Sequence, residues 1–91
     1  MIARRFLISG MVQGVGYRYF AIRAAQRHDV VGTVRNLPDG RVEVIAEAEP
    51  AAMAAFKAEL EQGPPHARVR QVEEFELTPT GRFFRFTVDV P

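Results

Sequence analysis

Glycine and arginine occur together in one short segment, GMVQGVGYR at residues 10–18. Ordered glycine costs conformational entropy, so the backbone at Gly10, Gly14 and Gly16 is itself expected to approach a ligand. Backbone N–H groups in such a loop can bind an anion together with the positive end of a following helix. The planar guanidinium of Arg18 can contact two oxygens of one phosphate. The segment therefore predicts an anion cradle, and a flexible loop with a surface arginine is the alternative that these residues leave open.

Two common phosphate-binding motifs do not fit this segment. The P-loop requires a Lys-Ser/Thr pair after its last glycine, and that pair is absent. The dinucleotide-binding fingerprint requires GxGxxG followed about 20 residues later by an acidic residue. The glycine spacing here is GxxxGxG, and Arg35 and Asn36 occupy the later position. Because Asn36 precedes the turn residues Pro38, Asp39 and Gly40, its simplest interpretation from the residues alone is a turn residue.

The composition is that of an ordinary globular protein. The 91 residues carry a net charge of +1, with 47% hydrophobic and 25% charged residues, so we expect one domain over residues 1–91. The near-neutral charge argues against nucleic acid or an anionic membrane as a partner. No cysteine is present, which excludes disulfides and cysteine-based metal sites. The first ten residues lack the apolar run of a signal peptide or membrane span, so we expect a cytoplasmic protein.

Hydrophobic periodicity and turn residues predict the order strand, helix, strand, strand, helix, strand, closed by a last apolar segment. Pro38 and Gly40 indicate a hairpin turn, and Pro50 and Gly63 fit the two ends of the second helix. This order predicts an α+β fold of the ferredoxin-like split βαβ type (βαββαβ), with an antiparallel sheet and two helices on one face. The expected elements are strand 4–9, helix 17–28, strands 30–36 and 41–47, helix 50–62, and strands 67–77 and 82–88.

Alternation within the strands predicts which side chains face the core. An irregularity is expected near Val72 in strand 67–77. In strand 41–47, three residues are expected to point inward and four outward, namely Val42, Val44 and Ala46 against Arg41, Glu43, Ile45 and Glu47. In the last strand, three apolar residues are expected to share one face, namely Phe84, Phe86 and Val88.

Two spaced motifs closely resemble the acylphosphatase family. The family patterns GxVQGVGFR and GxVxNxxDGxVE correspond to GMVQGVGYR at 10–18 and GTVRNLPDGRVE at 32–43. The resemblance covers essentially the whole chain in length and element order. This chain departs from the family at Thr33, where an aromatic residue is common, and at His28-Asp29, where a glycine often ends the first helix. Neither departure touches Arg18 or Asn36.

The resemblance implies hydrolysis of an acyl phosphate to a carboxylate and inorganic phosphate, with no metal, nucleotide or other cofactor. Arg18 would bind the phosphoryl oxygens, and Asn36 would orient the attacking water, so the resemblance favours a functional role for Asn36. The split βαβ arrangement can bring the end of the second strand beside the first. The phosphate would be held by the backbone N–H groups of Met11, Val12, Gln13, Gly14, Val15 and Gly16. A carboxylate leaving group has a conjugate-acid pKa of about 4, so the reaction tolerates the absence of a general acid.

The implied partner is a small-molecule acyl phosphate, with inorganic phosphate or sulfate as competing anions and the chain expected to be a monomer. The side chain of Gln13 is a candidate for steadying the loop, whereas His28 and His66 are not expected to act as bases. A non-catalytic module of the same fold that binds acyl phosphate, carbamoyl phosphate or another anion is the alternative function. An RNA-recognition module is disfavoured, because its aromatic residues would lie on the first and third strands and 41–47 has none.

Overall fold

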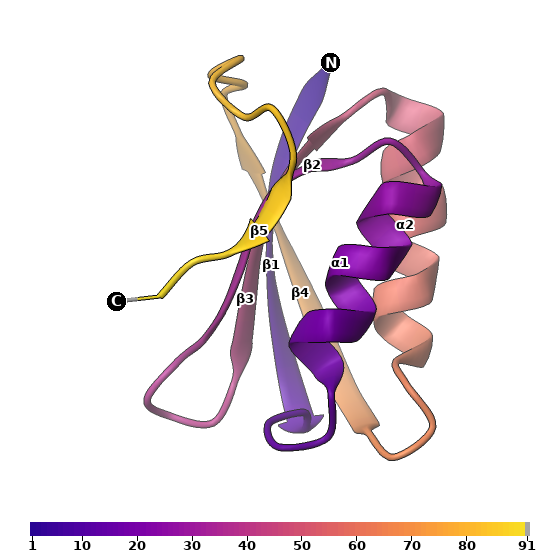
Figure 1. The fold of residues 1–91 in the computed structure, drawn as a ribbon, viewed down its shortest axis with the longest axis vertical. Coiled ribbons are helices and arrows are strands. Elements are labelled where there is room, and N and C mark those ends of the chain that lie inside the picture. Colours follow the sequence, from indigo (N-terminus) through magenta and orange to yellow (C-terminus); the bar gives the residue numbers. More distant parts are fainter. Residues whose placement is uncertain (91) are drawn as a thin grey trace.

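Two helices cover one face of a five-stranded sheet in the computed structural model of the protein, which describes residues 1–90 (Figure 1). The elements are β1 (Ile2–Met11), α1 (Tyr17–Arg27), β2 (Val31–Asn36), β3 (Val42–Ala48), α2 (Pro50–Gln62), β4 (Arg68–Leu77) and β5 (Phe86–Val88). The strand order is β4-β1-β3-β2-β5. The predicted α+β split βαβ class is confirmed, but the sheet is mixed, because β5 pairs parallel to β2 while every other neighbouring pair is antiparallel.

The core lies between the two helices and the sheet. Small side chains let α1 approach closely, and larger ones from α2 fill the remaining space; the fully or almost fully buried ones are Ala21, Ala24, Ala25, Met53, Phe56 and Leu60. The ring of Phe56 meets Phe6 of β1 edge-on at a centroid distance of 6.3 Å and Phe86 of β5 at 5.7 Å. This aromatic cluster packs α2 against both β1 and β5. It therefore helps to fix the position of β1, the strand that leads into the glycine-rich loop.

The turn between β2 and β3 forms where it was predicted. Gly40 has a φ of 95°, which the absence of a side chain permits, and its N–H donates to the Leu37 carbonyl at 3.1 Å. The Leu37 N–H donates in turn to the Arg41 carbonyl at 2.8 Å. Asn36 pairs with Val42 as the last residue of β2. The turn therefore holds Asn36 at a defined place at one end of the sheet.

A β-bulge precedes the glycine-rich loop. Ser9 pairs with Gln71 of β4, but Gly10 pairs with Val69, so Arg70 is the extra residue. This confirms an irregularity close to Val72, two residues from the bulged position. A Cβ on Gly10 would lie 2.0 Å from the Arg68 carbonyl oxygen, so only glycine fits at the bulge.

Two carboxylates predicted on the outward face of β3, those of Glu43 and Glu47, are buried. Glu43 is only 7% exposed because the guanidinium groups of Arg5 and Arg35 each donate to it at 2.7 Å from the neighbouring strands. Burial acts to raise the pKa of Glu43, but the hydrogen bonds and charges of the two arginines outweigh burial and hold this pKa below its usual value. Glu47 is 2% exposed, because Thr80 and Gly81 of the segment between β4 and β5 donate to its carboxylate.

The prediction that Phe84 shares a face with Phe86 and Val88 is wrong. Phe84 is 95% exposed and lies outside β5, which begins at Phe86. Phe86 is buried and pairs with Gly32 of β2. Because β5 is only three residues long, the alternation that would have turned Phe84 inward does not extend back to it.

The residue that follows the C-cap of helix α1, Asp29, adopts a left-handed conformation. Asp29 has a φ of 55°, the one positive φ among non-glycine residues of the described chain, 1–90. We expect Asp29→Gly to raise the free energy of unfolding by about 0.5–1 kcal/mol, because relief of the backbone strain exceeds the added entropy of the unfolded chain. A higher urea midpoint with an unchanged m value would show the gain. Asp29→Ala, which keeps a Cβ, should show no gain, and equal stabilisation by both variants would contradict the explanation.

Candidate active site

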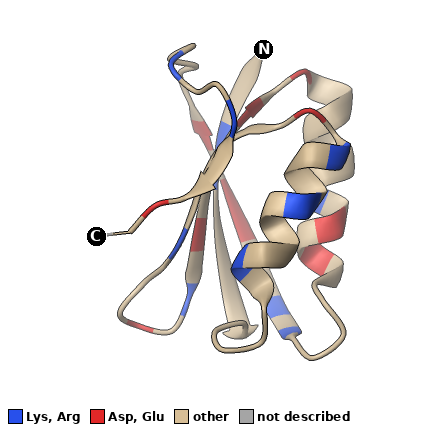
Figure 2. Cartoon of the chain, in the orientation of Figure 1, with Lys and Arg blue, Asp and Glu red and all other residues tan. Residues whose placement is uncertain are grey.

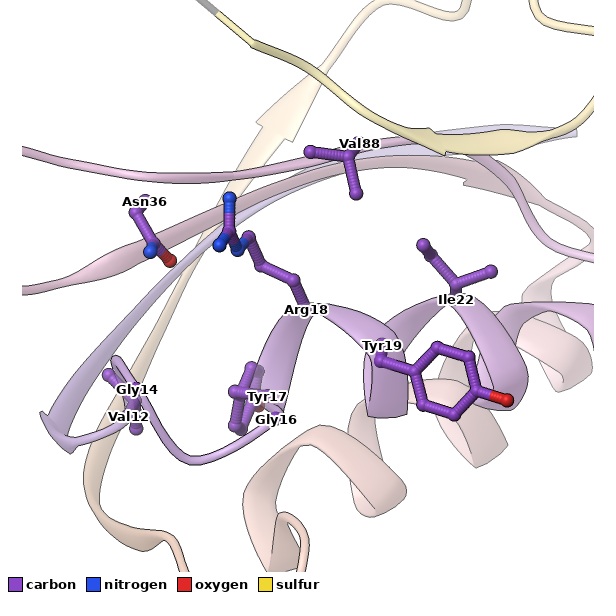
Figure 3. Close-up of a pocket in the computed structure, with 9 residues that line it drawn as sticks. All are labelled: Val12, Gly14, Gly16, Tyr17, Arg18, Tyr19, Ile22, Asn36 and Val88. Atoms are coloured by element: carbon purple, nitrogen blue, oxygen red, sulfur yellow. The ribbon is translucent and has the colours of Figure 1, made fainter.

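A pocket of about 380 Å³ opens where the glycine-rich loop, the start of α1, the end of β2 and β5 meet (Figure 3). Its lining residues are Val12, Gly14, Gly16, Tyr17, Arg18, Tyr19, Ile22, Asn36 and Val88. The structure therefore brings Arg18 and Asn36, predicted from two separate motifs, to one pocket together with part of the loop.

The loop presents free backbone donors. Gly14 and Gly16 have φ values of 75° and 80°, and a Cβ on either would meet nothing within 4 Å, so glycine is needed there for its conformation and not for space. Within residues 1–90, none of the backbone N–H groups from Gln13 to Gly16 donates a hydrogen bond. Gly16 is the N-cap of α1 without a side-chain cap, and the first turn has no acidic residue. The positive end of the helix is therefore uncompensated and available to an anion.

The six residues predicted to hold phosphate do not occupy equivalent positions. Val12, Gly14 and Gly16 line the pocket. Met11 is the last residue of β1, where it pairs with Arg68. Val15 packs against the hydrophobic core, and the side chain of Gln13 points to the β2–β3 turn.

Arg18 is exposed at the second position of α1. No carboxylate of the described residues lies within ion-pair distance of it. Figure 3 shows its guanidinium extended from the helix toward Asn36. An arginine without a competing internal partner can use its whole planar fork on a ligand.

Asn36 carries an unsatisfied polar atom. Its Oδ1 is buried and has no hydrogen-bond partner among the described residues. A buried acceptor left without a donor destabilises the folded state by about 1–3 kcal/mol. Such an atom in the wall of a pocket is suited to accept a hydrogen bond from water or a ligand.

The sequence suggested that the end of β2 lies beside β1, but the structure does not place it there. Strand β3 separates them in the sheet. Because β3 runs antiparallel to both, β1 and β2 point the same way, and their carboxyl ends reach the same edge of the sheet. Asn36 and the loop after β1 therefore meet at that edge, one strand apart.

The side chain of Gln13 links the glycine-rich loop after β1 to the turn after β2. Its side-chain Nε2 donates to the carbonyl of Leu37 at 2.8 Å and to that of Arg41 at 2.9 Å. Leu37 directly follows Asn36 in the chain. The amide of Gln13 thus sets the spacing between the loop and the strand end that carries Asn36.

Several lining residues were not predicted from the sequence. Ile22 lies one helical turn after Arg18, so the i, i+4 relation could have placed it on the same side of α1. Val88 reaches the pocket only because β5 adds parallel to β2, for which the sequence carries no local signal. Tyr17 packs beneath the pocket, where its hydroxyl donates to the Leu60 carbonyl at 2.7 Å, and burial raises the pKa of this hydroxyl above its usual value.

The βαββαβ order and the two helices on one face of the sheet place the chain in the ferredoxin-like class of α+β proteins. A family model described as acylphosphatase matches residues 4–88. The acylphosphatase of Actinobacillus succinogenes is 44% identical over 98% of this chain and 99% of its own length. The crystal structure of acylphosphatase from Bacillus subtilis matches with a TM-score of 0.95 at 33% identity, covering 99% of this chain and 100% of that one. The chain belongs to the acylphosphatase family.

The same fold also occurs inside a much longer protein. The crystal structure of HypF from T. kodakarensis matches with a TM-score of 0.86 at 34% identity. The match covers 100% of this chain but only 12% of HypF.

Proposed function

We propose that this protein hydrolyses the carboxyl–phosphate bond of acyl phosphates, giving a carboxylate and inorganic phosphate. The observation that carries the proposal is the buried, unpartnered Oδ1 of Asn36 in one pocket with the free guanidinium of Arg18. Membership of the acylphosphatase family supports the same activity.

In this proposal the loop and Arg18 bind the phosphoryl group. The free N–H groups between Gln13 and Gly16, with the positive end of α1, hold the phosphoryl oxygens. Arg18 contacts the same oxygens with two parallel hydrogen bonds and offsets their charge as the bond to the leaving group weakens. Phosphoryl transfer requires mainly such positioning and electrostatic stabilisation.

Asn36 acts on the water. Its Oδ1 accepts a hydrogen bond from a water molecule and holds that water in line with the bond that breaks. The water oxygen bonds to phosphorus, the bond from phosphorus to the carboxylate oxygen breaks, and the carboxylate leaves with the bonding electrons. Both water protons end on the phosphate product, because a carboxylate of pKa about 4 leaves without protonation.

Hydrolysis of benzoyl phosphate in the presence of a metal chelator tests the function. We expect turnover at an undiminished rate, with inorganic phosphate and sulfate as competitive inhibitors of the same pocket. Binding of inorganic phosphate without any turnover would contradict the proposal and would support a non-catalytic anion-binding module. We also propose that the active form is a monomer, which light scattering of the active protein checks.

We expect Gln13 to affect catalysis indirectly, because it holds the loop at a fixed distance from Asn36. We expect Gln13→Met, which keeps the size of the side chain but removes its donor, to lower kcat/KM for benzoyl phosphate by about tenfold. The loss should fall mainly on kcat, because the loop keeps its free N–H groups while the distance to Asn36 is no longer held. The matched control is Gln71→Met on β4, an exposed glutamine outside the pocket. Equal effects of the two variants, or a change in stability alone, would contradict this role.

A further inference from the structure

A second hollow adjoins the proposed phosphate pocket along α1. It measures about 460 Å³, and its lining residues are Tyr19, Ile22, Arg23, Gln26 and Arg27. Tyr19 and Ile22 line both hollows. In Figure 3, these two side chains lie on the side of Arg18 away from Asn36. An acyl group attached to a phosphate at Arg18 therefore has a path along the exposed side of α1 toward Arg23.

This path is positively charged. Helix α1 carries arginines at 18, 23 and 27 and no acidic residue, and Figure 2 shows them as three basic bands along it. Arg27 is engaged by Glu59 of α2. Arg23 has no carboxylate within ion-pair distance among residues 1–90. The second hollow thus contains a cation whose charge is not neutralised by the protein.

Tyr19 holds Arg23 in place. The Nη1 atom of Arg23 donates to the Tyr19 hydroxyl at 3.2 Å, and its guanidinium carbon lies 5.6 Å from the centre of the Tyr19 ring. These contacts leave other donors of the guanidinium free. Tyr19 itself is 64% exposed, so its ring can also contact an apolar part of a ligand.

We propose that Tyr19 and Arg23 form a subsite for acyl groups that carry a second, distal carboxylate, so that the favoured substrates are acyl phosphates of dicarboxylic acids. This inference rests on the proposed function. Arg23 lies five residues after Arg18, which is roughly 7.5 Å along the helix axis and about 140° around it. A short diacid chain would therefore run from the phosphate at Arg18 across Tyr19 and Ile22, the residues that line both hollows, to the guanidinium of Arg23. Ile22, Val88 and the Tyr19 ring would contact the methylene groups, and the guanidinium of Arg23 would bind the distal carboxylate.

The test compares two substrates of equal chain length. Succinyl phosphate ends in a carboxylate and butanoyl phosphate in a methyl group. We expect the unaltered protein to show a kcat/KM ratio of up to about five in favour of succinyl phosphate, the upper end of the range for one solvent-exposed ion pair. The ratio should fall to about one in Arg23→Ala, mainly through KM for succinyl phosphate, and should decline with added salt. Arg23→Lys should retain part of the ratio.

A matched control removes the same charge elsewhere. Arg82 is exposed in the segment between β4 and β5 and lines neither hollow. Arg82→Ala should leave the ratio unchanged, and an equal fall in this variant would overturn the subsite. The subsite would also be overturned if both substrates were hydrolysed equally well or if Arg23→Ala kept the preference. Failure to hydrolyse benzoyl, butanoyl and succinyl phosphate alike would instead overturn the proposed function and the subsite with it.

Discussion

Replacing Arg18 with alanine is expected to lower kcat/KM for benzoyl phosphate by at least ~10²–10³-fold, the loss typical of removing one preorganised donor to a transition state. The folded state should be unaffected, since Arg18 is exposed and makes no ion pair within residues 1–90. Steady-state kinetics and a thermal melt on the same sample measure both effects. The inhibition constant of inorganic phosphate should rise as well, because the same guanidinium contacts ground-state phosphate.

We expect that a lysine at position 18 cannot perform the function of Arg18. Arg18→Lys keeps the charge but substitutes a compact ammonium for the planar fork, so we expect nearly the full loss of Arg18→Ala. Arg82→Ala is the control for a general change in charge and should retain normal turnover. Near-normal activity in a folded Arg18→Ala variant would refute the role assigned to this residue. Good activity in Arg18→Lys would show that charge alone suffices there.

Replacing Asn36 with alanine should lower the rate of hydrolysis by a similar factor, but through kcat and not through phosphate binding. We expect kcat for benzoyl phosphate to fall by ~10²–10³-fold while the inhibition constant of inorganic phosphate changes little, because Asn36 acts on the water and not on the phosphoryl group. Stability should not decrease, since the change removes a buried Oδ1 that has no partner in the structure. Turnover, phosphate inhibition and thermal unfolding together distinguish this outcome from local disruption.

A second variant tests the role of Asn36 by adding a negative charge at the same place. Asn36→Asp retains the shape and an acceptor oxygen but brings a negative charge into a pocket that would hold an anion. We expect weaker phosphate inhibition in this variant, in contrast to Asn36→Ala. If Asn36→Ala weakened phosphate binding and left kcat unchanged, the side chain would be a phosphate ligand and the assignment to water would be wrong.

The elements that the sequence predicted well are those governed by neighbouring residues. Gly40 and Pro38 specified the hairpin turn, and the turn forms at 37–40, where the Gly40 N–H donates to the Leu37 carbonyl. Pro50 begins α2 and Gly63 caps its end with a φ of 70°. Both outcomes depend on the φ angles that glycine and proline permit, which are properties of the local chain.

The burial of two β3 carboxylates, which alternation does not predict, depends on residues far away in the chain. Alternation placed Glu43 on the outward face correctly, but its burial comes from Arg5 and Arg35 on neighbouring strands. Glu47 is covered by a segment more than thirty residues later, which donates to its carboxylate. No local pattern encodes such partners, because they are set by strand order.

For the candidate site, the sequence by itself determined the chemistry that is available: a glycine-rich loop with free donors, Arg18 one residue into a helix, and Asn36 at the end of a hairpin strand. Only the tertiary structure decided that these groups share a pocket. Two strands that run the same way, separated by β3, deliver the loop and Asn36 to one edge of the sheet. The hydrogen bond that Gln13 donates to the Leu37 carbonyl follows from this packing. So does the unpartnered Oδ1 of Asn36. Each depends on atoms that come together only when the sheet is complete.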